Sequence, residues 1–285
     1  MKAGMVSVVV RAHHGANLNY LRDAIRSIKN QRYQPVEIIL MGQGLVVSEL
    51  EAIEGILSDA KKRKSLTTQI KNIKVKPGTD ARARLLFEGI KLARGQYLAF
   101  LDYDDILYPN CYEYLVKTLK KNKGSVLAAG LCMTVKIKTK NLKKPKITSK
   151  TPWMPHHQSI LDLLFWNMLP IHSFLIDRKN TKPSDFAISS KMTTLEDYYL
   201  LLKLASRHAF VLNSKTTPVC EYRFRDDGSN TTPDHQNKND HRVKKWKSGE
   251  IRIRELKAKL FKKFNLAELE REISILKHAL TKELS

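Results

Sequence analysis

Residues 93–105 read ARGQYLAFLDYDD, and this stretch decides the fold. Its centre, Tyr97–Leu101, is apolar throughout and predicts a β-strand that is buried on both faces. Asp102, Asp104 and Asp105 follow directly, so carboxyl groups gather where that strand ends. In an open α/β sheet, ligands bind beyond the carboxyl ends of the strands. The stretch therefore predicts a sheet with a ligand site at the acidic end of this strand.

The residues on the N-terminal side of this stretch alternate between two patterns. Apolar, β-branched runs predict strands, and apolar residues three or four apart predict helices. The expected strands are 6–10, 36–41 and 70–75, and the expected helices are 18–28, 50–57 and 81–93, the last capped by Gly95. Such apolar strands alternating with helices indicate a parallel sheet covered on both faces. The predicted fold class is α/β, with a Rossmann-like, mostly parallel central sheet flanked by helices.

The residues on the C-terminal side are less regular. Strands are expected at 126–135, 172–176, 210–212 and 219–224, and helices at 109–119, 161–168 and 195–205. Lys136–Lys150 holds seven lysines and no acidic residue, which favours an exposed loop. Residues 226–240 are polar and rich in turn formers, which predicts a mobile loop that could close over a ligand.

The chain changes character from about His241. Residues 238–263 hold eleven Lys or Arg and three acidic residues. We expect a basic helix, a break near Asn265, and a second amphipathic helix with apolar residues from Leu266 to Leu280. Three roles stay open for this tail: docking on an anionic membrane, packing on the rest of the chain through its apolar stripe, or dimerisation.

The net charge is the oddity of the composition. The 285 residues include 51 Lys+Arg and 28 Asp+Glu, so the formal charge is 51 − 28 = +23. Such a charge predicts attraction to an anionic partner. No transmembrane helix or signal peptide is expected, because the longest apolar stretch, 160–176, contains Asp162 and Pro170. The three cysteines lie far apart, which predicts neither a disulfide framework nor a zinc site and favours a reducing, cytoplasmic compartment.

Two acidic motifs carry the candidate chemistry. The carboxylates of residues 102–105 repel one another, and a Mg²⁺ or Mn²⁺ ion would relieve that repulsion. The alternative is a solvated turn in which Asp105 or Asn110 caps the next helix. Glu196 and Asp197 begin a predicted helix, where they are either helix caps or a general base beside a bound phosphate group.

These motifs, in this order, resemble an inverting, GT-A-fold glycosyltransferase of family two. The resemblance spans roughly residues 5–230 and rests on four blocks: SVVV (7–10) with SIKNQ (27–31), EIILM (37–41), RARLLFEG (82–89) with the stretch 93–105, and LEDY (195–198). It implies three parts of the chain: 1–105 as the nucleotide-sugar-binding half, 106–240 as the acceptor-binding and catalytic-base half, and 241–285 as a basic helical tail.

The resemblance implies a role for each candidate residue. Asp104, with Asp102, would bind Mn²⁺ or Mg²⁺ at the donor diphosphate. Asp197 would deprotonate the acceptor hydroxyl, and Glu196 would orient Asp197 or the acceptor. The donor would be a nucleoside-diphosphate sugar, most simply a UDP-sugar, bound by Ala12, His13, Gln43, Arg82, Asp102 and Tyr103. The acceptor would be a saccharide or a lipid-linked molecule in bacterial surface polysaccharide or glycoconjugate synthesis.

The sequence departs from the family at the nucleotide site. Its first strand ends in RAHH (11–14) instead of Pro-Thr-Tyr-Asn, and its second ends in GQG (42–44) instead of Asp-Asp-Gly-Ser. Gln43 could read a base edge through its amide, so the nucleotide stays open. His172, Arg223 and Arg225 are further candidates for contact with diphosphate or acceptor, and each could equally be structural.

Other classes of function compete with sugar transfer. Nucleic-acid binding would suit the charge, but the lysine-rich segments lack interleaved aromatic residues and no nucleic-acid motif is present. A catalytically silent, nucleotide- or partner-binding relative would suit the altered GQG segment. Sugar transfer is the favoured hypothesis, because Asp102, Asp104 and Asp197 are all intact.

Overall fold

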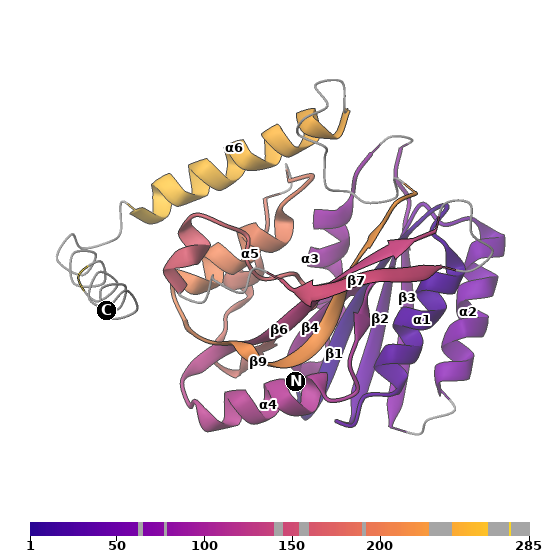
Figure 1. Cartoon of the computed structure of the whole chain (residues 1–285), viewed down its shortest axis with the longest axis horizontal. Coiled ribbons are helices and arrows are strands. Elements are labelled where there is room, and N and C mark those ends of the chain that lie inside the picture. The colour runs from indigo at the N-terminus through magenta and orange to yellow at the C-terminus, as the bar shows by residue number, and fades with distance from the viewer. Residues whose placement is uncertain are drawn as a thin grey trace.

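The computed structural model describes residues 1–61, 65–76, 79–139, 145–153, 160–189, 192–227, 241–261 and 274. Within these residues the chain forms a nine-stranded sheet with helices on both faces (Figure 1). The strand order is β3-β2-β1-β4-β8-β6-β9-β5, and β7 pairs with β6 outside this path. One sheet therefore runs through both halves of the predicted catalytic region.

The first half confirms the predicted alternation of strands and helices. Strands β1 to β4 pair in parallel, and β1 lies between β2 and β4. The apolar runs reflect burial on both faces, because Val6–Val10 is completely buried. The elements are β1 (Lys2–His13), α1 (Leu18–Lys29), β2 (Val36–Gln43), α2 (Val47–Lys61), β3 (Leu66–Ile73), α3 (Arg82–Leu92) and β4 (Gly95–Asp102).

The second half mixes strand directions. Strand β8 is antiparallel to both β4 and β6, whereas β6 and β9 are parallel to each other. The elements are β5 (Ile106–Leu107), α4 (Cys111–Lys121), β6 (Ser125–Lys138), β7 (Lys146–Pro152), β8 (Phe174–Asp177), α5 (Glu196–Ala205), β9 (Ala209–Arg225) and α6 (His241–Phe261). Short 3₁₀ helices lie at Ile160–Leu164, Arg178–Asn180 and Pro183–Phe186.

Several predicted elements need correction. The loop expected over Lys136–Lys150 is wrong at both ends, because β6 continues to Lys138 and β7 begins at Lys146. Strand β7 is exposed or half-exposed along its length, so it carries no alternating apolar signal. The two strands expected near 210 and 220 are one strand, β9, which pairs with β6 over most of its length.

The helix caps and a predicted helix also differ from expectation. Ala93, not Gly95, is the C-cap of α3, and Gly95 begins β4. A glycine is needed there because a Cβ would lie 2.5 Å from the carbonyl oxygen of Met5. The helix expected over 161–168 is only the 3₁₀ turn Ile160–Leu164.

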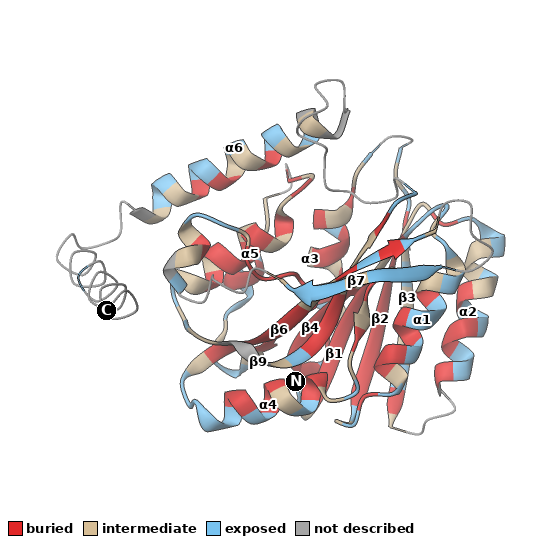
Figure 2. Ribbon diagram, in the orientation of Figure 1, coloured by how far each residue is buried: buried red, intermediate tan, exposed pale blue. Residues whose placement is uncertain are grey.

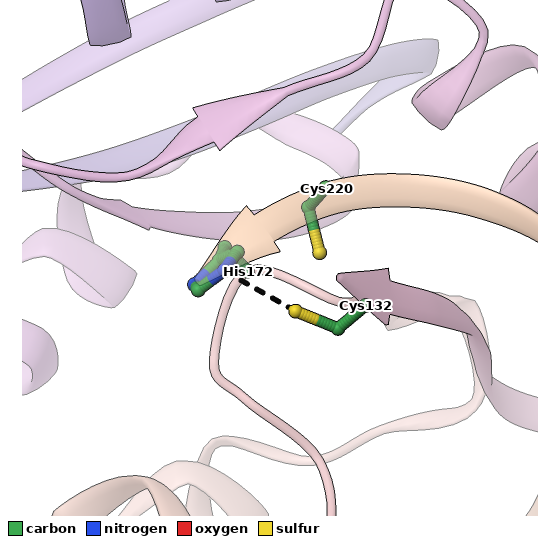
Figure 3. Close-up of side chains that lie close together, drawn as sticks. All are labelled: Cys132, His172 and Cys220. Atoms are coloured by element: carbon green, nitrogen blue, oxygen red, sulfur yellow. Dashed lines mark hydrogen bonds between the residues drawn. The ribbon is translucent and has the colours of Figure 1, made fainter. Parts of the chain in front are cut away.

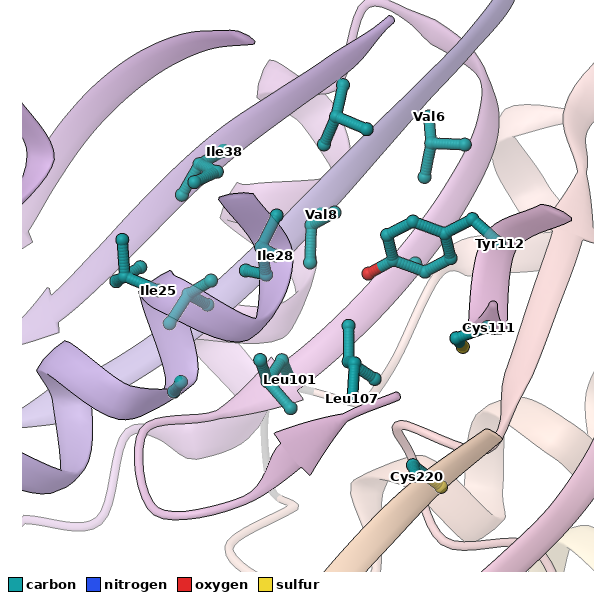
Figure 4. Packing of buried hydrophobic residues seen from close by; sticks show 14 of the residues in the cluster. Val6, Val8, Ile25, Ile28, Ile38, Leu101, Leu107, Cys111, Tyr112 and Cys220 are labelled. Atoms are coloured by element: carbon teal, nitrogen blue, oxygen red, sulfur yellow. The ribbon is translucent and has the colours of Figure 1, made fainter. Parts of the chain in front are cut away.

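The core forms two layers, one on each face of the sheet (Figure 2). Side chains alternate along β1, so that Val6, Val8 and Val10 join one layer and Val9 joins the other. Helices α1, α2 and α4 cover the first layer, part of which is seen in Figure 4. Helices α3, α5 and α6 cover the second. The two layers fix β1 and β4, whose carboxyl ends carry the candidate site.

Helix α6 packs on the sheet domain through its apolar side. Ile253 and Leu256 are buried in the second layer. Gly249 allows close approach to Thr194, since a Cβ there would lie 2.4 Å from the threonine hydroxyl. Of the alternatives for the tail, packing on the domain is the one that α6 adopts. The break near Asn265, the helix 266–280 and most of the loop 226–240 lie outside the described residues.

No helix among the described residues is long and apolar enough to cross a membrane.

Candidate functional site

A cleft of about 420 Å³ opens at the carboxyl ends of β1, β2 and β4. Six residues predicted to bind the donor or metal, together with Asp104, line it: Ala12, His13, Gln43, Arg82, Asp102 and Tyr103. Arg223, a further candidate for contact with diphosphate or acceptor, also lines the cleft. Among the described residues, Glu196, Asp197, His172 and Arg225 are not part of the lining.

Arg11 links the two acidic motifs. It pairs in register with Asp102 on the neighbouring strand, and its Nε and Nη2 donate to Asp102 Oδ1 and Oδ2 at 2.7 and 2.9 Å. Its Nη1 donates to Glu196 Oε1 from the start of α5. Burial opposes the charged guanidinium, but the two carboxylates raise the pKa of Arg11 well above its ordinary value. One cation, with 12% of its side chain exposed, therefore joins β1, β4 and α5 at the cleft wall.

This arrangement corrects, at Asp102 only, the expectation that the carboxylates of residues 102–105 raise one another's pKa. The pKa values of Asp104 and Asp105 are raised, by burial and also by their carboxylate neighbours. Burial raises the pKa of Asp102, but Arg11 outweighs it and lowers that pKa below its ordinary value. Burial raises the pKa of Glu196, and Arg11 offsets only part of that effect. The mutual repulsion is already relieved at Asp102 by a cation of the chain itself.

Asp104 also has a cationic partner. Arg225 Nη1, at the end of β9, donates to Asp104 Oδ2 at 2.9 Å, and Nη2 donates to the carbonyl oxygen of Asp104 at 2.5 Å. The Arg225 guanidinium carbon lies 4.0 Å from the centre of the Tyr20 ring, a cation–π contact. Burial raises the pKa of Asp104 even though Arg225 opposes this. Arg225 thus contacts the predicted metal ligand.

Asp105 points away from the next helix. Its Oδ1 accepts the backbone N–H of Arg223 at 2.8 Å, and its Oδ2 lies 3.3 Å from His172 Nδ1. Asn110 is the N-cap of α4 but makes no side-chain capping bond. The capping alternative for Asp105 and Asn110 is therefore wrong. His172 is buried against Asp105, and the expectation that it reaches the cleft is not met.

The loop after β3 helps to line the cleft. Gln43 Nε2 donates to the carbonyl of Thr79, and Gln43 Oε1 accepts from the N–H of Ala81, both at 2.9 Å. An amide has two N–H donors and two acceptor lone pairs, so one of each remains for a ligand. Arg82 is held by Asp80 at 3.0 Å.

The two carboxylates of the Glu196–Asp197 pair point to different neighbours. Leu195 has a left-handed backbone (φ 59°) and serves as the N-cap of α5. Glu196 is buried on Arg11, whereas Asp197 accepts from Asn167 Nδ2 at 3.1 Å and from the N–H of Tyr198 at 2.8 Å. No ion pair holds Asp197 among the described residues. The more accessible Asp197 is therefore the better placed of the two to accept a proton.

Sequence reasoning missed several residues of the site. Arg11 was noted only as a departure from the family's motif, although its side chain holds the two acidic motifs together. Its role becomes visible only when the register places it opposite Asp102. Lys245 of α6 lines the cleft, although the sequence of the basic tail gives no signal of a contribution to it. Thr79 and Asp80 also line it.

The carboxylates suit a hard divalent cation at Asp104 better than at Asp102. Both oxygens of Asp102 are held by Arg11. Arg225 holds only Oδ2 of Asp104, and among the described residues no hydrogen bond reaches its Oδ1. Asp104 lines the cleft, and 22% of its side chain is exposed. Carboxylate oxygens of this kind are what Mg²⁺ and Mn²⁺ bind.

Residues 7–179 match the family model of Glycosyl transferase family 2. The match covers more than half of the sequence, and the chain belongs to this family. An uncharacterized glycosyltransferase of Haemophilus influenzae is 27% identical over 256 residues, which cover 87% of this chain and 73% of the relative. One from Rickettsia bellii is 33% identical over 129 residues, or 44% of this chain and 17% of the relative. The chain spans less than two fifths of each of five Rickettsia relatives that it matches.

Solved structures share the fold. Residues 1–349 of S. aureus TarS in complex with UDP superpose with a TM-score of 0.57 at 13% identity, covering 77% of this chain and 60% of that one. The mannosyltransferase PcManGT of Pyrobaculum calidifontis, with GDP-Man and Mn²⁺, gives a TM-score of 0.52 at 13% identity, covering 78% and 58%. The architecture is that of the GT-A glycosyltransferases, as the sequence predicted.

Proposed function

We propose that this chain transfers a sugar from a nucleoside-diphosphate sugar to an acceptor hydroxyl with inversion at the anomeric carbon. The observation that carries the proposal is the cleft at the carboxyl ends of β1, β2 and β4, where Asp102 and Asp104 lie among basic residues and Arg11 connects Asp102 to Glu196. Family membership supports it, as do neighbours solved with UDP, UDP-GlcNAc or GDP-Man.

The donor occupies the cleft in this proposal. The Arg82, Arg223 and Lys245 side chains line it and supply positive charge for a diphosphate. The remaining N–H and lone pair of Gln43 are available to a base, and a UDP-sugar is the proposed donor. Asp104, beside Asp102, is the proposed ligand of Mn²⁺ or Mg²⁺. Such an ion stabilises the negative charge of a leaving diphosphate.

Asp197 is the proposed general base. It takes the proton of the acceptor hydroxyl, whose oxygen attacks the anomeric carbon opposite the leaving diphosphate, and this single displacement inverts the configuration. Asn167 orients the carboxylate through its bond at 3.1 Å. Glu196 is a positioning residue, because its carboxylate is committed to Arg11 and anchors the first turn of α5.

The acceptor side carries exposed aromatic rings. Phe165 and Trp166 are 70% and 54% exposed and directly precede Asn167. Exposed apolar residues grouped beside a polar site mark ligand contacts. We assign them to a saccharide acceptor, free or lipid-linked, of surface polysaccharide or glycoconjugate synthesis.

The outward side of α6 supports contact with an anionic membrane surface on the cytoplasmic side. Lys247, Arg254 and Lys259 are exposed there, whereas the apolar side is covered by the domain. The proposed contact is therefore electrostatic and salt-dependent, without insertion of α6 into lipid. Sedimentation with anionic vesicles in low and high salt tests it, and equal sedimentation with neutral vesicles would contradict it.

The transfer reaction is tested with a panel of nucleotide sugars and saccharide acceptors, with and without Mn²⁺. We expect one donor class to support transfer, loss of turnover in EDTA, and a product of inverted anomeric configuration by NMR. Asp197→Asn is expected to lower kcat by about 10²–10⁴-fold with little change in donor affinity. Asp23→Asn, on the exposed face of α1, is the control and keeps full activity. Donor binding without any transfer or hydrolysis, or an active Asp197→Asn variant, contradicts the proposal.

A further inference from the structure

Cys132, His172 and Cys220 meet in the interior although they lie far apart in the sequence (Figure 3). Cys132 lies on β6, Cys220 lies opposite it in register on β9, and His172 lies in the turn before β8. All three are buried, and both cysteines are free thiols. The wide sequence spacing of the cysteines is the reason to predict no zinc site. The fold removes that reason, because it brings Cys132, His172 and Cys220 together.

The separations of the three side chains suit a common cation. The candidate ligand atoms lie within 4.8 Å of one another, and Cys132 Sγ is 3.8 Å from His172 Nε2. Tetrahedral zinc has Zn–S bonds of about 2.3 Å and Zn–N bonds of about 2.0 Å, which put sulfur and nitrogen about 3.5 Å apart. Only small side-chain movements separate the observed arrangement from a coordinated one.

The histidine has the partner that metal-bound histidines use. His172 Nδ1 lies 3.3 Å from Asp105 Oδ2, an ion-pair distance without hydrogen-bond geometry, while Nε2 faces the Cys132 sulfur. A carboxylate at Nδ1 favours the tautomer with its proton there, so the Nε2 lone pair is free to bind a metal. Asp105 is itself held by the N–H of Arg223 at 2.8 Å. The carboxylate beside Nδ1 is therefore held in place by a residue outside the ligand set.

We propose that Cys132, Cys220 and His172 Nε2 bind one Zn²⁺ ion. Two thiolates and an imidazole favour zinc over the Mg²⁺ or Mn²⁺ that suits carboxylates such as Asp104, so this is a second, chemically distinct site. Binding displaces the two thiol protons to solvent. The ion joins β6 and β9 to the turn before β8, and Asp105 connects it to the acidic end of β4.

The test uses the full-length, untagged and reduced chain. Metal analysis after incubation with zinc and desalting is expected to give one equivalent per chain. Co²⁺ in place of zinc is expected to give a sulfur-to-cobalt charge-transfer band, a readout that needs neither a variant nor enzyme activity. Absence of bound zinc and of that band overturns the proposal. An intact mass lower by two hydrogens, the mark of a Cys132–Cys220 disulfide in the protein as isolated, also overturns it.

Variants assign the ligands. Cys132→Ser and Cys220→Ser each remove one thiolate. Each variant is therefore expected to lose that thiolate's share of the charge-transfer band and to bind zinc much more weakly. Asp105→Asn is expected to weaken it by about 10–100-fold, as for other outer partners of a ligand histidine. Cys111→Ala, which removes the remaining buried cysteine, is the matched control and keeps one equivalent. Circular dichroism checks that each variant is folded, and unchanged affinity in folded Cys132→Ser contradicts the assignment.

Discussion

Arg11 gives the sharpest test of how the two acidic motifs are held together. Replacing it with methionine keeps much of the side-chain volume but removes the cation shared by Asp102 and Glu196. Only 3% of the Glu196 side chain is exposed, against 32% for Asp102, so the larger penalty falls on Glu196. Removing one partner of a buried ion pair costs about 3–5 kcal/mol. Arg82 also attracts Glu196, so part of the stabilisation remains when Arg11 is removed. We therefore expect Arg11→Met to lower the free energy of unfolding by about 3 kcal/mol, the lower end of that range.

The assay is urea unfolding at neutral pH. We expect the double variant Arg11→Met/Glu196→Gln to recover most of the loss, because a neutral amide leaves no buried charge. The loss of unfolding free energy in Arg11→Met is also expected to depend on pH. Burial raises the pKa of Glu196 above its ordinary 4.5 in the folded chain, and loss of Arg11 raises it further. The penalty at Glu196 therefore grows as pH rises above the raised pKa that Glu196 has in the folded wild type, and it is absent below about 4.5, where Glu196 is protonated in the folded and unfolded states.

A matched control shows whether the loss of stability comes from this ion pair or from removing an arginine in general. Arg26 on α1 is 65% exposed and lies 3.9 Å from Asp23, so Arg26→Met is expected to cost less than about 1 kcal/mol. If Arg11→Met costs no more than Arg26→Met, or if Glu196→Gln recovers nothing, the shared-cation account is refuted.

Three further predictions concern other parts of the chain. Burial favours neutral Asp185, but its bonds to a backbone N–H and two cationic side chains lower its pKa from 3.8 to about 2. Wild type should therefore lose about 2 kcal/mol more stability than Asp185→Asn as pH falls from about 4 to 2, measured by urea unfolding. A Cβ at Gly89 would lie 2.4 Å from Val9, so Gly89→Ala is expected to cost about 1–3 kcal/mol, whereas Gly55→Ala, with open space, stabilises α2 by up to about 1 kcal/mol. Trp166→Ala is expected to raise the KM for a saccharide acceptor and leave that for the donor unchanged in steady-state assays; a change confined to the donor would contradict its assignment.

The sequence predicted those parts of the fold whose burial is strong and local. Strands β2 and β4 are buried along nearly their whole length, β1 is buried over Met5–Val10, and the periodicity of α1 follows from one covered face. The same features placed Asp102 and Asp104 at a strand end beside a cleft. Strand β7 was missed because its exposed side chains leave no apolar pattern, and it exists through pairing with β6.

The parts of the site that escaped prediction depend on register and on contacts between distant segments. Arg11 meets Asp102 because β1 and β4 are neighbours, and it meets Glu196 across 185 positions of sequence. His172 was expected near the cleft but is buried on Asp105. The sequence spacing of Cys132 and Cys220 says nothing of their meeting across β6 and β9.

The end of β9 has a consequence for how this chain tolerates insertions and deletions. Glu221 and Arg223 bond to each other at 2.9 Å, while the alternating residues Tyr222 and Phe224 pack together with Trp153. Successive side chains of a strand point to opposite faces, so adding or removing one residue exchanges the two sets. The aromatic rings would then take the places of the charged groups beside Asp104 and Asp105, and the guanidinium groups would enter the aromatic cluster. A substitution in this segment changes one side chain, whereas the insertion or deletion of one residue changes the surroundings of all its side chains at once.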